Sequence, residues 1–303
     1  MVSLKTTLSG IELENPLILA SGILGQTAET MANMYEMGFG ALVTKSIGKD
    51  PRSGHPNPTM TELDTGLLNA MGLPNQGIEL FESELDELFS MISGKPVIGS
   101  IFASDPQGFA ELALKMESCG VSGVELNLSC PHAKGYGATL GTDPVTAGNV
   151  VLEVSDAIKI PIFAKLPPAD NISEIAQAVE GAGAHGIVAI NTLKAMAIDL
   201  ETQKPFLGNI VGGYSGPGIK PVGLRCVYEV YQAVDIPVIG CGGINTGRDA
   251  LEYILAGATA LEIGSSVYYR GKNAPDLIKD EIKEALQALE IETLDELIGI
   301  AHD

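Results

Sequence analysis

A cysteine that could do chemistry lies in the run 127–131 (NLSCP), just ahead of a glycine-rich stretch at 134–137. An isolated cysteine is usually a small buried hydrophobe, and that is our interpretation of the other three cysteines in the chain. Cys130 differs because proline and glycine bound its loop, where a thiol can meet a substrate and act as a base or a nucleophile. We therefore predict that the chemistry of this chain centres on Cys130.

Polar residues and glycines also follow the apolar runs that we interpret as strands. These residues are Ser21, Lys45, Asn127, Lys165, Asn191, Gly242 and Gly264. Two lysines and two amides that converge on one apolar opening combine charge with paired donors and acceptors. Such a set is well suited to an anionic ring system that is rich in carbonyl groups.

Glycines follow the last two of these runs, at Gly242-Gly243 and at Gly264-Ser265-Ser266. Many barrels bind phosphate after the seventh and eighth strands, through bare backbone N–H groups and a helix N-terminus. One glycine pair after a strand is equally typical of a tight turn. The two positions together favour a phosphate site.

The elements that must position these residues form a repeating pattern. Eight short aliphatic or β-branched runs alternate with eight amphipathic segments, which is typical of βα units and a parallel sheet. The predicted strands are residues 17–20, 41–44, 97–101, 123–126, 162–164, 186–190, 238–239 and 260–263, and the predicted helices are residues 29–37, 76–92, 106–119, 145–158, 172–182, 222–234, 248–256 and 274–289. We expect an α/β fold in which residues 1–303 form a single (β/α)8 TIM barrel of one domain.

Three connections are longer than the usual loop, namely residues 45–75, 129–143 and 192–220. Long ordered connections in compact domains tend to be functional. All three leave the C-terminal ends of predicted strands, where barrels of this kind keep their active sites. We expect them to cover that face of the barrel.

The composition excludes several classes of protein. The net charge of −20, from 38 acidic and 18 basic residues, would repel a phosphate backbone, so nucleic acid is not an expected partner. No stretch approaches the roughly 18 apolar residues of a membrane-spanning helix, and no basic-then-apolar signal opens the chain. We therefore expect a cytoplasmic protein that does not associate with a membrane. We also expect no metal site, because the cysteines lack the spacings of zinc or iron–sulfur sites.

The chain resembles the catalytic subunit of class 1B dihydroorotate dehydrogenases over nearly its whole length. The motifs that carry the resemblance are 69–73 (NAMGL), 127–131 (NLSCP), 190–193 (INTL), 207–209 (LGN), 215–217 (SGP), 240–244 (GCGGI) and 256–258 (AGA). Class 2 enzymes have serine at the position of Cys130 and a membrane-associating extension, and this sequence shows neither. The run 196–202 (MAIDLET) is similar to class 1B in particular.

The resemblance implies a bound FMN and the oxidation of dihydroorotate to orotate, the flavin step of pyrimidine (UMP) biosynthesis. Cys130 would remove the proton from C5 of dihydroorotate while a hydride leaves C6 for N5 of the flavin. The resemblance also implies a homodimer with two electron-transfer subunits attached, as a heterotetramer. Those subunits would carry FAD and a 2Fe–2S cluster and would pass the electrons to NAD.

The resemblance assigns the remaining site residues as well. The substrate would be held by Lys45, Asn69, Asn127, Asn191 and Thr192, with backbone groups of Met71, Gly72 and Leu73. The flavin would contact Ser21, Lys45, Ser46, Ser100, Asn127, Lys165, Ile190 and Gly216, with its phosphate on Gly242, Gly243, Gly264 and Ser265. Lys165 would lie near N1 and O2 of the flavin and stabilise the negative charge of its reduced form.

Three residues depart from the family pattern, in which asparagine is usual at the positions of His132, Ser100 and His55. They leave open the alternative that the chain is an FMN oxidoreductase that acts on a related dihydropyrimidine. One interpretation is that a neutral His132 replaces the hydrogen bonds of an amide. The other is that His132 modulates Cys130 or the carboxylate pocket in a pH-dependent way. Two other classes also remain open: a flavin-storing or assembly subunit without turnover, which the intact Cys130 and Lys45 disfavour, and a flavin-free phosphosugar isomerase, which a colourless protein would indicate.

Overall fold

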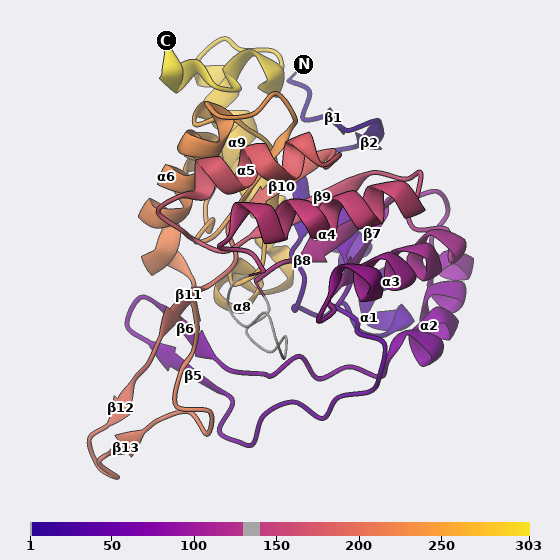
Figure 1. Ribbon diagram of the computed structural model, residues 1–303. Coiled ribbons are helices and arrows are strands. Elements are labelled where there is room, and N and C mark those ends of the chain that lie inside the picture. The colour runs from indigo at the N-terminus through magenta and orange to yellow at the C-terminus, as the bar shows by residue number, and fades with distance from the viewer. Residues whose placement is uncertain (1, 130–139) are drawn as a thin grey trace.

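Eight parallel strands close into a barrel in the computed structural model, which describes residues 2–129 and 140–303 (Figure 1). Neighbouring strands follow one another in chain order around the ring. They are β3 (Leu17–Leu19), β4 (Ala41–Val43), β7 (Val97–Ile101), β8 (Gly123–Asn127), β9 (Ile162–Leu166), β10 (Gly186–Ala189), β15 (Val238–Cys241) and β16 (Ala258–Ile263). The predicted (β/α)8 barrel is confirmed. Five of these strands differ from their predicted bounds by no more than one residue.

Helices follow the strands and surround the barrel (Figure 1). They are α1 (Ala28–Glu36), α2 (Ile78–Met91), α3 (Pro106–Ser118), α4 (Pro144–Ala157), α5 (Ile172–Gly181), α6 (Lys220–Tyr231), α7 (Gly247–Leu255), the short α8 (Ser266–Arg270) and α9 (Ala274–Ala288). All except α8 were predicted. Across the described residues, every helix is too short or too polar to span a lipid bilayer.

Local signals fix where these helices begin and which face they bury. The side chains of Asp105 and Asp143 accept backbone N–H groups in the first turns of α3 and α4, each with proline as the first helical residue. In α9, buried Ile278, Ile282 and Leu286 recur at a spacing of four residues. That spacing gives one apolar stripe along the helix, which packs on the main core.

Two of the three long connections contain strands that the sequence did not reveal. β5 (Met60–Leu63), β6 (Gly66–Asn69), β11 (Leu193–Ala195) and β14 (Gly212–Ser215) form an antiparallel sheet in the order β11-β14-β6-β5. We call this four-stranded sheet the arm sheet. The hairpin of β12 (Ile198–Asp199) and β13 (Lys204–Pro205) projects beyond it, away from the barrel (Figure 1). These strands were missed because they are short and, apart from the buried β6, half-exposed or exposed, without an apolar period.

The N-terminal ends of the barrel strands, which we call the floor, are sealed by apolar side chains. The hairpin of β1 (Thr6–Leu8) and β2 (Ile11–Leu13) packs its buried leucines and isoleucine against the interior residues there. Phe163 of β9 fills the centre and is fully buried. A Cβ on Gly123 or Gly186 would lie 2.8 or 2.9 Å from its ring, so glycine leaves room for Phe163. The opposite, C-terminal ends of the strands form the mouth.

Candidate active site at the barrel mouth

Amide side chains from different strand ends are linked at the mouth. Asn191, which follows β10, donates from Nδ2 to Oδ1 of Asn127 at the end of β8, over 3.3 Å. The Asn191 side chain also accepts the backbone N–H of Thr192 (2.8 Å). Asn69 of β6 donates to the carbonyl of Gly213 (3.4 Å), and a Cβ on Gly213 would lie 2.2 Å from Oγ1 of Thr192. Four of the predicted substrate residues therefore lie together.

Lys45 follows β4 and brings a half-buried ammonium to the mouth. Burial lowers the pKa of Lys45, because water is partly excluded from its charge. Within the described residues, its side chain forms no hydrogen bond or ion pair. A cation that is desolvated without an acidic partner is unfavourable until an anion joins it. Lys45 is therefore placed to bind an anionic ligand.

Lys165 lies inside the barrel between two carboxylates. Its Nζ donates to Oε2 of Glu125 on β8 (3.3 Å) and to Oε2 of Glu262 on β16 (2.5 Å). Burial opposes the charge of Lys165, but Glu125 and Glu262 outweigh it and hold the pKa of the ammonium above its usual range. From the sequence, Lys165 was predicted to be a second cation for the ligand. The structure shows a lysine that already has two acidic partners.

The two glutamates were not among the predicted site residues. Glu125 and Glu262 are 1% and 2% exposed, each within a strand that is largely apolar. A charged residue inside an apolar strand was the signal that could have found them, because such residues are almost never fully buried unless they are paired. Their partner could not be read from the sequence.

A row of serine hydroxyls joins this acid cluster to the mouth. Ser100 of β7 donates to Oε1 of Glu125 (2.9 Å), and its Oγ lies 2.9 Å from that of Ser46. Ser46 in turn lies 3.1 Å from Ser21 and accepts a hydrogen bond from Asn127 (3.2 Å). Ser100 is fully buried, Ser46 is 4% exposed, and Ser21 is half-buried. The row therefore runs from the interior outward.

The loop after β15 has the backbone shape of an anion cradle. Gly242 and Gly243 have φ of +125° and +73°, and the carbonyl of Gly242 accepts a hydrogen bond from Tyr253 (2.6 Å). On the neighbouring strand end, after β16, Ser266 at the start of α8 is fully buried, and its hydroxyl has no partner among the described residues. A buried hydroxyl without a partner is unusual, so it marks a place for a polar ligand.

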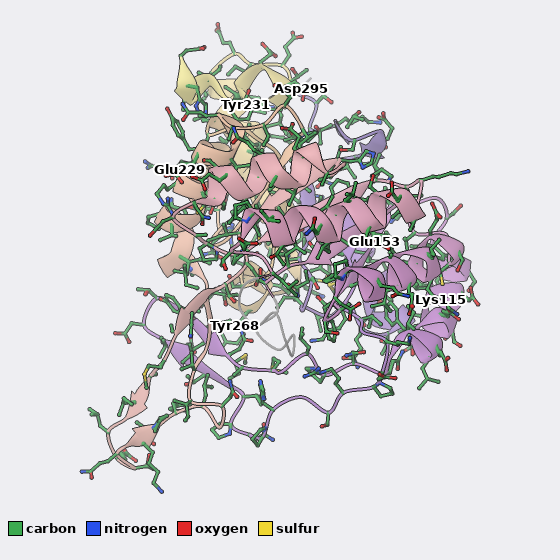
Figure 2. The ribbon with its side chains drawn as sticks, viewed as in Figure 1. Lys115, Glu153, Glu229, Tyr231, Tyr268 and Asp295 are labelled. Atoms are coloured by element: carbon green, nitrogen blue, oxygen red, sulfur yellow. The ribbon has the colours of Figure 1, made fainter. Side chains whose placement is uncertain are left out.

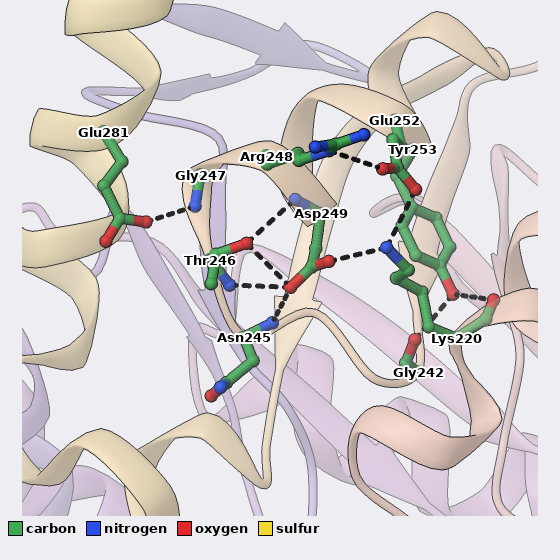
Figure 3. A network of polar contacts seen from close by, with 10 residues as sticks. All are labelled: Lys220, Gly242, Asn245, Thr246, Gly247, Arg248, Asp249, Glu252, Tyr253 and Glu281. Carbon is green, nitrogen blue, oxygen red and sulfur yellow. Dashed lines mark hydrogen bonds and ion pairs between the residues drawn. The ribbon is translucent and has the colours of Figure 1, made fainter.

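Charged residues on α6 and α7 hold this loop in place (Figure 3). The carboxylate of Asp249 accepts the backbone N–H groups of Asn245 (3.0 Å) and Thr246 (2.9 Å). Lys220 forms ion pairs with Asp249 (2.7 Å) and Glu252 (2.9 Å), which connect the start of α6 to α7. The loop that carries the paired glycines is therefore fixed from its outer side.

Other predicted residues border the same region. Ile190 is buried and follows β10 through a cis peptide bond from Ala189. Gly216 has a φ of +100°, and its carbonyl oxygen would lie 2.9 Å from a Cβ on Gly243. Tyr268 of α8 donates to Glu62 of β5 (3.1 Å), so the arm sheet is joined to the end of the barrel near the glycine loop (Figure 2).

Three of the predicted substrate residues lie in the loop that follows β6. Met71, Gly72 and Leu73 follow β6, and their contacts run to the preceding loop, where the N–H of His55 donates to the carbonyl of Met71 (3.0 Å). The side chain of Met71 is 41% exposed. These three residues follow directly on Asn69, the last residue of β6, which lies at the mouth.

The predicted base, Cys130, lies outside the described residues, and so does His132. The other cysteines are free thiols. Burial raises the pKa of Cys226 to about 11 and that of Cys241 to about 12, and it also raises the pKa of Cys119. These three thiols are protonated at neutral pH, which agrees with their interpretation as unreactive residues.

Comparison with known proteins gives the family of the chain. The family model for dihydroorotate dehydrogenase matches residues 3–286. A protein of Methanocaldococcus jannaschii, named dihydroorotate dehydrogenase B (NAD(+)), catalytic subunit, is 49% identical over 303 residues, 99% of this chain and 98% of that protein. The chain belongs to the dihydroorotate dehydrogenase family. The protein of the same name from Pyrococcus horikoshii is 50% identical over 300 residues, 98% of this chain and 97% of that protein.

A solved structure shares the fold of this family member. The crystal structure of DHODH from Eimeria tenella in complex with ferulenol has a TM-score of 0.85 at 24% sequence identity, covering 99% of this chain and 88% of that chain. The family model and the relatives named above, rather than this structure, confirm the resemblance to the dihydroorotate dehydrogenase family that the sequence motifs indicate.

Proposed function

We propose that this chain is the catalytic subunit of an NAD-linked dihydroorotate dehydrogenase of class 1B, which binds FMN at the barrel mouth and oxidises dihydroorotate to orotate in pyrimidine biosynthesis. Membership of the dihydroorotate dehydrogenase family supports this function. The observation that carries it is the ammonium of Lys45. It is half-buried without an acidic partner in the described part of the chain, beside a linked set of amides.

The substrate is a pyrimidinedione with a carboxylate, and the mouth offers what each part needs. Lys45 supplies the positive charge for the carboxylate. Amide side chains carry both a donor and an acceptor, as does the edge of the ring. We assign substrate binding to Lys45, Asn69, Asn127, Asn191 and Thr192, with the backbone of Met71, Gly72 and Leu73.

The residues present also fit FMN. The left-handed backbone at Gly242 and Gly243 and the unpartnered hydroxyl of Ser266 match a phosphate group. We assign the cofactor site to Ser21, Lys45, Ser46, Ser100, Asn127, Lys165, Ile190, Gly216, Gly242, Gly243, Gly264 and Ser265, in one FMN-binding domain. When bound, FMN supplies the hydride acceptor of the reaction.

Cys130 is the proposed base that takes the proton from C5 of dihydroorotate. A thiol of ordinary pKa, about 8.5, is mostly protonated at neutral pH, so the rate is expected to rise as the solution becomes alkaline. The electrons then leave through a partner subunit with FAD and a 2Fe–2S cluster to NAD. Two copies of each chain would form the heterotetramer around a homodimeric core.

A visible spectrum tests cofactor and substrate together. The purified chain is expected to be yellow, and millimolar dihydroorotate under anaerobic conditions is expected to bleach the flavin. Cys130→Ala should bleach far more slowly, while the matched control Cys119→Ala, at the end of α3, should bleach like the parent. A colourless protein would contradict the cofactor assignment. A yellow protein that dihydroorotate does not bleach would contradict the substrate.

The alternative substrate, a related dihydropyrimidine, is less well supported by the structure. Ser100 was one reason for it, but this hydroxyl already bonds Glu125 and Ser46 inside the barrel, so it gives no reason to change the substrate. The alternative then depends on His132, which lies outside the described residues. Dihydrouracil lacks the carboxylate that Lys45 would bind, so it is expected not to bleach the flavin.

A further inference from the structure

Asn75 is a buried asparagine at which two long segments beside the mouth meet. It lies in the connection between β6 and α2 and is 5% exposed. The connection that follows β4 runs next to it, because Arg52 and Asn75 exchange backbone hydrogen bonds in both directions, over 2.8 and 3.1 Å. The two connections run side by side between the barrel and the arm sheet (Figure 1). Asn75 therefore lies where the segment that begins with Lys45 meets the segment of residues 71–73.

The side chain of Asn75 bonds three backbone groups. Its Oδ1 accepts the N–H of Gly48 (3.3 Å) and the N–H of Gly77 (2.9 Å). Its Nδ2 donates to the carbonyl of Leu73 (2.9 Å). Gly48 comes shortly after Lys45 in the sequence, and Gly77 is the residue before α2. One amide therefore holds the segment of Lys45, the loop after β6 and the start of α2 together.

The loop after β6 has a backbone that its surroundings must hold in shape. Gly72 has a φ of +75° and Leu73 a φ of +54°. Glycine adopts such angles freely, whereas leucine does so only where neighbouring groups keep it there. The carbonyl of Met71 accepts the N–H of His55, and the carbonyl of Leu73 accepts Nδ2 of Asn75. The bond from Asn75 therefore supports the loop at its strained residue.

The same loop offers consecutive backbone donors. The N–H groups of Met71, Gly72 and Leu73 donate to no group in the described part of the chain. Successive N–H groups in a turn can form a concavity that binds an anion. Lys45, on the neighbouring segment, is a half-buried cation without an acidic partner among the described residues. The loop and the cation are therefore suited to the same anionic group.

We propose that Asn75 is a positioning residue for substrate binding, which fixes the backbone of Leu73 against the segment of Lys45 so that both can hold one anionic end of the substrate. This inference rests on the proposed function, because it takes an anionic pyrimidinedione as the ligand. Asn75 acts through the backbone of Leu73 and Gly48 and does not touch the substrate. Binding groups must be held within a fraction of an ångström, and a misplacement of about 1 Å can cost about 10²-fold in rate.

Asn75→Ala removes the three side-chain hydrogen bonds without changing the charge of the chain. The FMN-bound protein is mixed anaerobically with dihydroorotate, and the rate of flavin bleaching is measured over a range of concentrations. The concentration that gives half the maximal rate should rise by about 10- to 100-fold, while the maximal rate should stay within about threefold of the parent. This split is expected because the displaced groups hold substrate and transition state alike.

Asn15→Ala is the matched control at the floor. Asn15 lies ahead of β3 and is 7% exposed, and its side chain also bonds backbone groups, the N–H of Leu17 (3.1 Å) and the carbonyl of Gly38 (3.2 Å). Asn15→Ala should lose a comparable amount of stability in urea unfolding but keep the parental half-saturating concentration. If Asn15→Ala and Asn75→Ala needed the same concentration of dihydroorotate, Asn75 would have a structural role alone and the proposal would be wrong.

Orotate binding to the oxidised protein gives the corresponding equilibrium test, followed through the visible spectrum of the flavin. Asn75→Ala should bind orotate about 10- to 100-fold more weakly than the parent and bind FMN with parental affinity. Loss of both affinities by the same factor would overturn the proposal, because it would show a general loosening of the mouth. A parent that binds FMN but neither orotate nor dihydroorotate would instead overturn the proposed function.

Hydrogen exchange in the unmodified, FMN-bound protein needs no variant, so it decides the question even if Asn75→Ala does not fold. Orotate should slow exchange in residues 71–73, whose N–H groups gain a partner. It should also slow exchange of Gly48 and Gly77, because a ligand held from both sides stabilises the bonds to Asn75. The hairpin of β1 and β2 at the floor should exchange at an unchanged rate. The proposal is wrong if orotate binds and exchange in residues 71–77 stays the same.

Discussion

The floor and the mouth of the barrel are built from the same strands but have opposite chemistry. Side chains two residues apart on a strand point to the same face, so a strand can line the interior with one residue type at one end and another at the other. At the floor the interior residues are Ile98, Phe163, Ile239 and Ala260, and two positions later they are Ser100, Lys165, Cys241 and Glu262. The barrel interior therefore changes from apolar to polar within two residues of each strand.

This contrast separates stability from chemistry. At the floor, apolar side chains gain free energy by leaving water and need no particular partner. At the mouth, each buried group needs a hydrogen bond or an opposite charge, and among the described residues the side chains of Lys45 and Ser266 have neither. We expect substitutions at the floor to lower stability and substitutions at the mouth to lower activity.

Phe163→Ala is expected to have the largest effect on the floor. Removing a fully buried phenylalanine should lower the free energy of unfolding by about 3–5 kcal/mol, because the ring leaves a cavity below the acid cluster. Urea unfolding measures the loss. The rate of flavin bleaching per folded molecule should stay that of the parent, and a slower rate in fully folded protein would show that floor and mouth are coupled.

Lys45→Met should lower activity and leave stability unchanged, the reverse of what is expected for Phe163→Ala. Loss of a cation that binds substrate charge is expected to lower the rate of bleaching by about 10²–10³-fold, and stability should not fall. The exposed Lys159, which precedes β9 at the floor side, gives the matched control Lys159→Met. A Lys45→Met protein with parental activity would remove Lys45 from the site.

The pH dependence of stability checks the same residue. Burial lowers the pKa of Lys45 in the folded chain, so the unfolded chain binds the proton more tightly. Stability should therefore rise with pH between the lowered value and the usual lysine value of about 10.4. Urea unfolding at several pH values should show this rise in the parent and a smaller one in Lys45→Met.

The sequence predicted the barrel because each βα unit carries its own local signals. Apolar runs such as 97–101 and caps such as Asp105 act over a few residues, so they can be read in order. The residues after the strands could be grouped for the same reason, since parallel strands end at one face. Asn127 and Asn191 do lie together there.

The acid cluster could not be predicted in this way. Glu262 lies on β16 and Lys165 on β9, which are not neighbours in the barrel, so their contact crosses its interior. The contact therefore depends on closure of the whole barrel. The arm sheet was missed for a related reason, because its strands pair across two connections far apart in the sequence.

Gly243→Ala is expected to have the smallest effect of these substitutions, and it tests the cradle at the mouth. The φ of +73° disfavours alanine, and the added Cβ would lie 2.7 Å from the backbone nitrogen of Lys220. A cost of about 1–2 kcal/mol should weaken FMN binding by roughly tenfold, measured by fluorescence quenching as FMN is added to flavin-stripped protein.

Gly120 provides the control, because its φ of +86° imposes similar backbone strain while a Cβ there would meet nothing within 4 Å. Gly120 follows α3 on the way to the floor end of β8. Gly120→Ala should lose a similar amount of stability and bind FMN like the parent. If both variants lost the same affinity, FMN binding would report the general stability of the barrel, and the paired glycines would have no special role as a cradle.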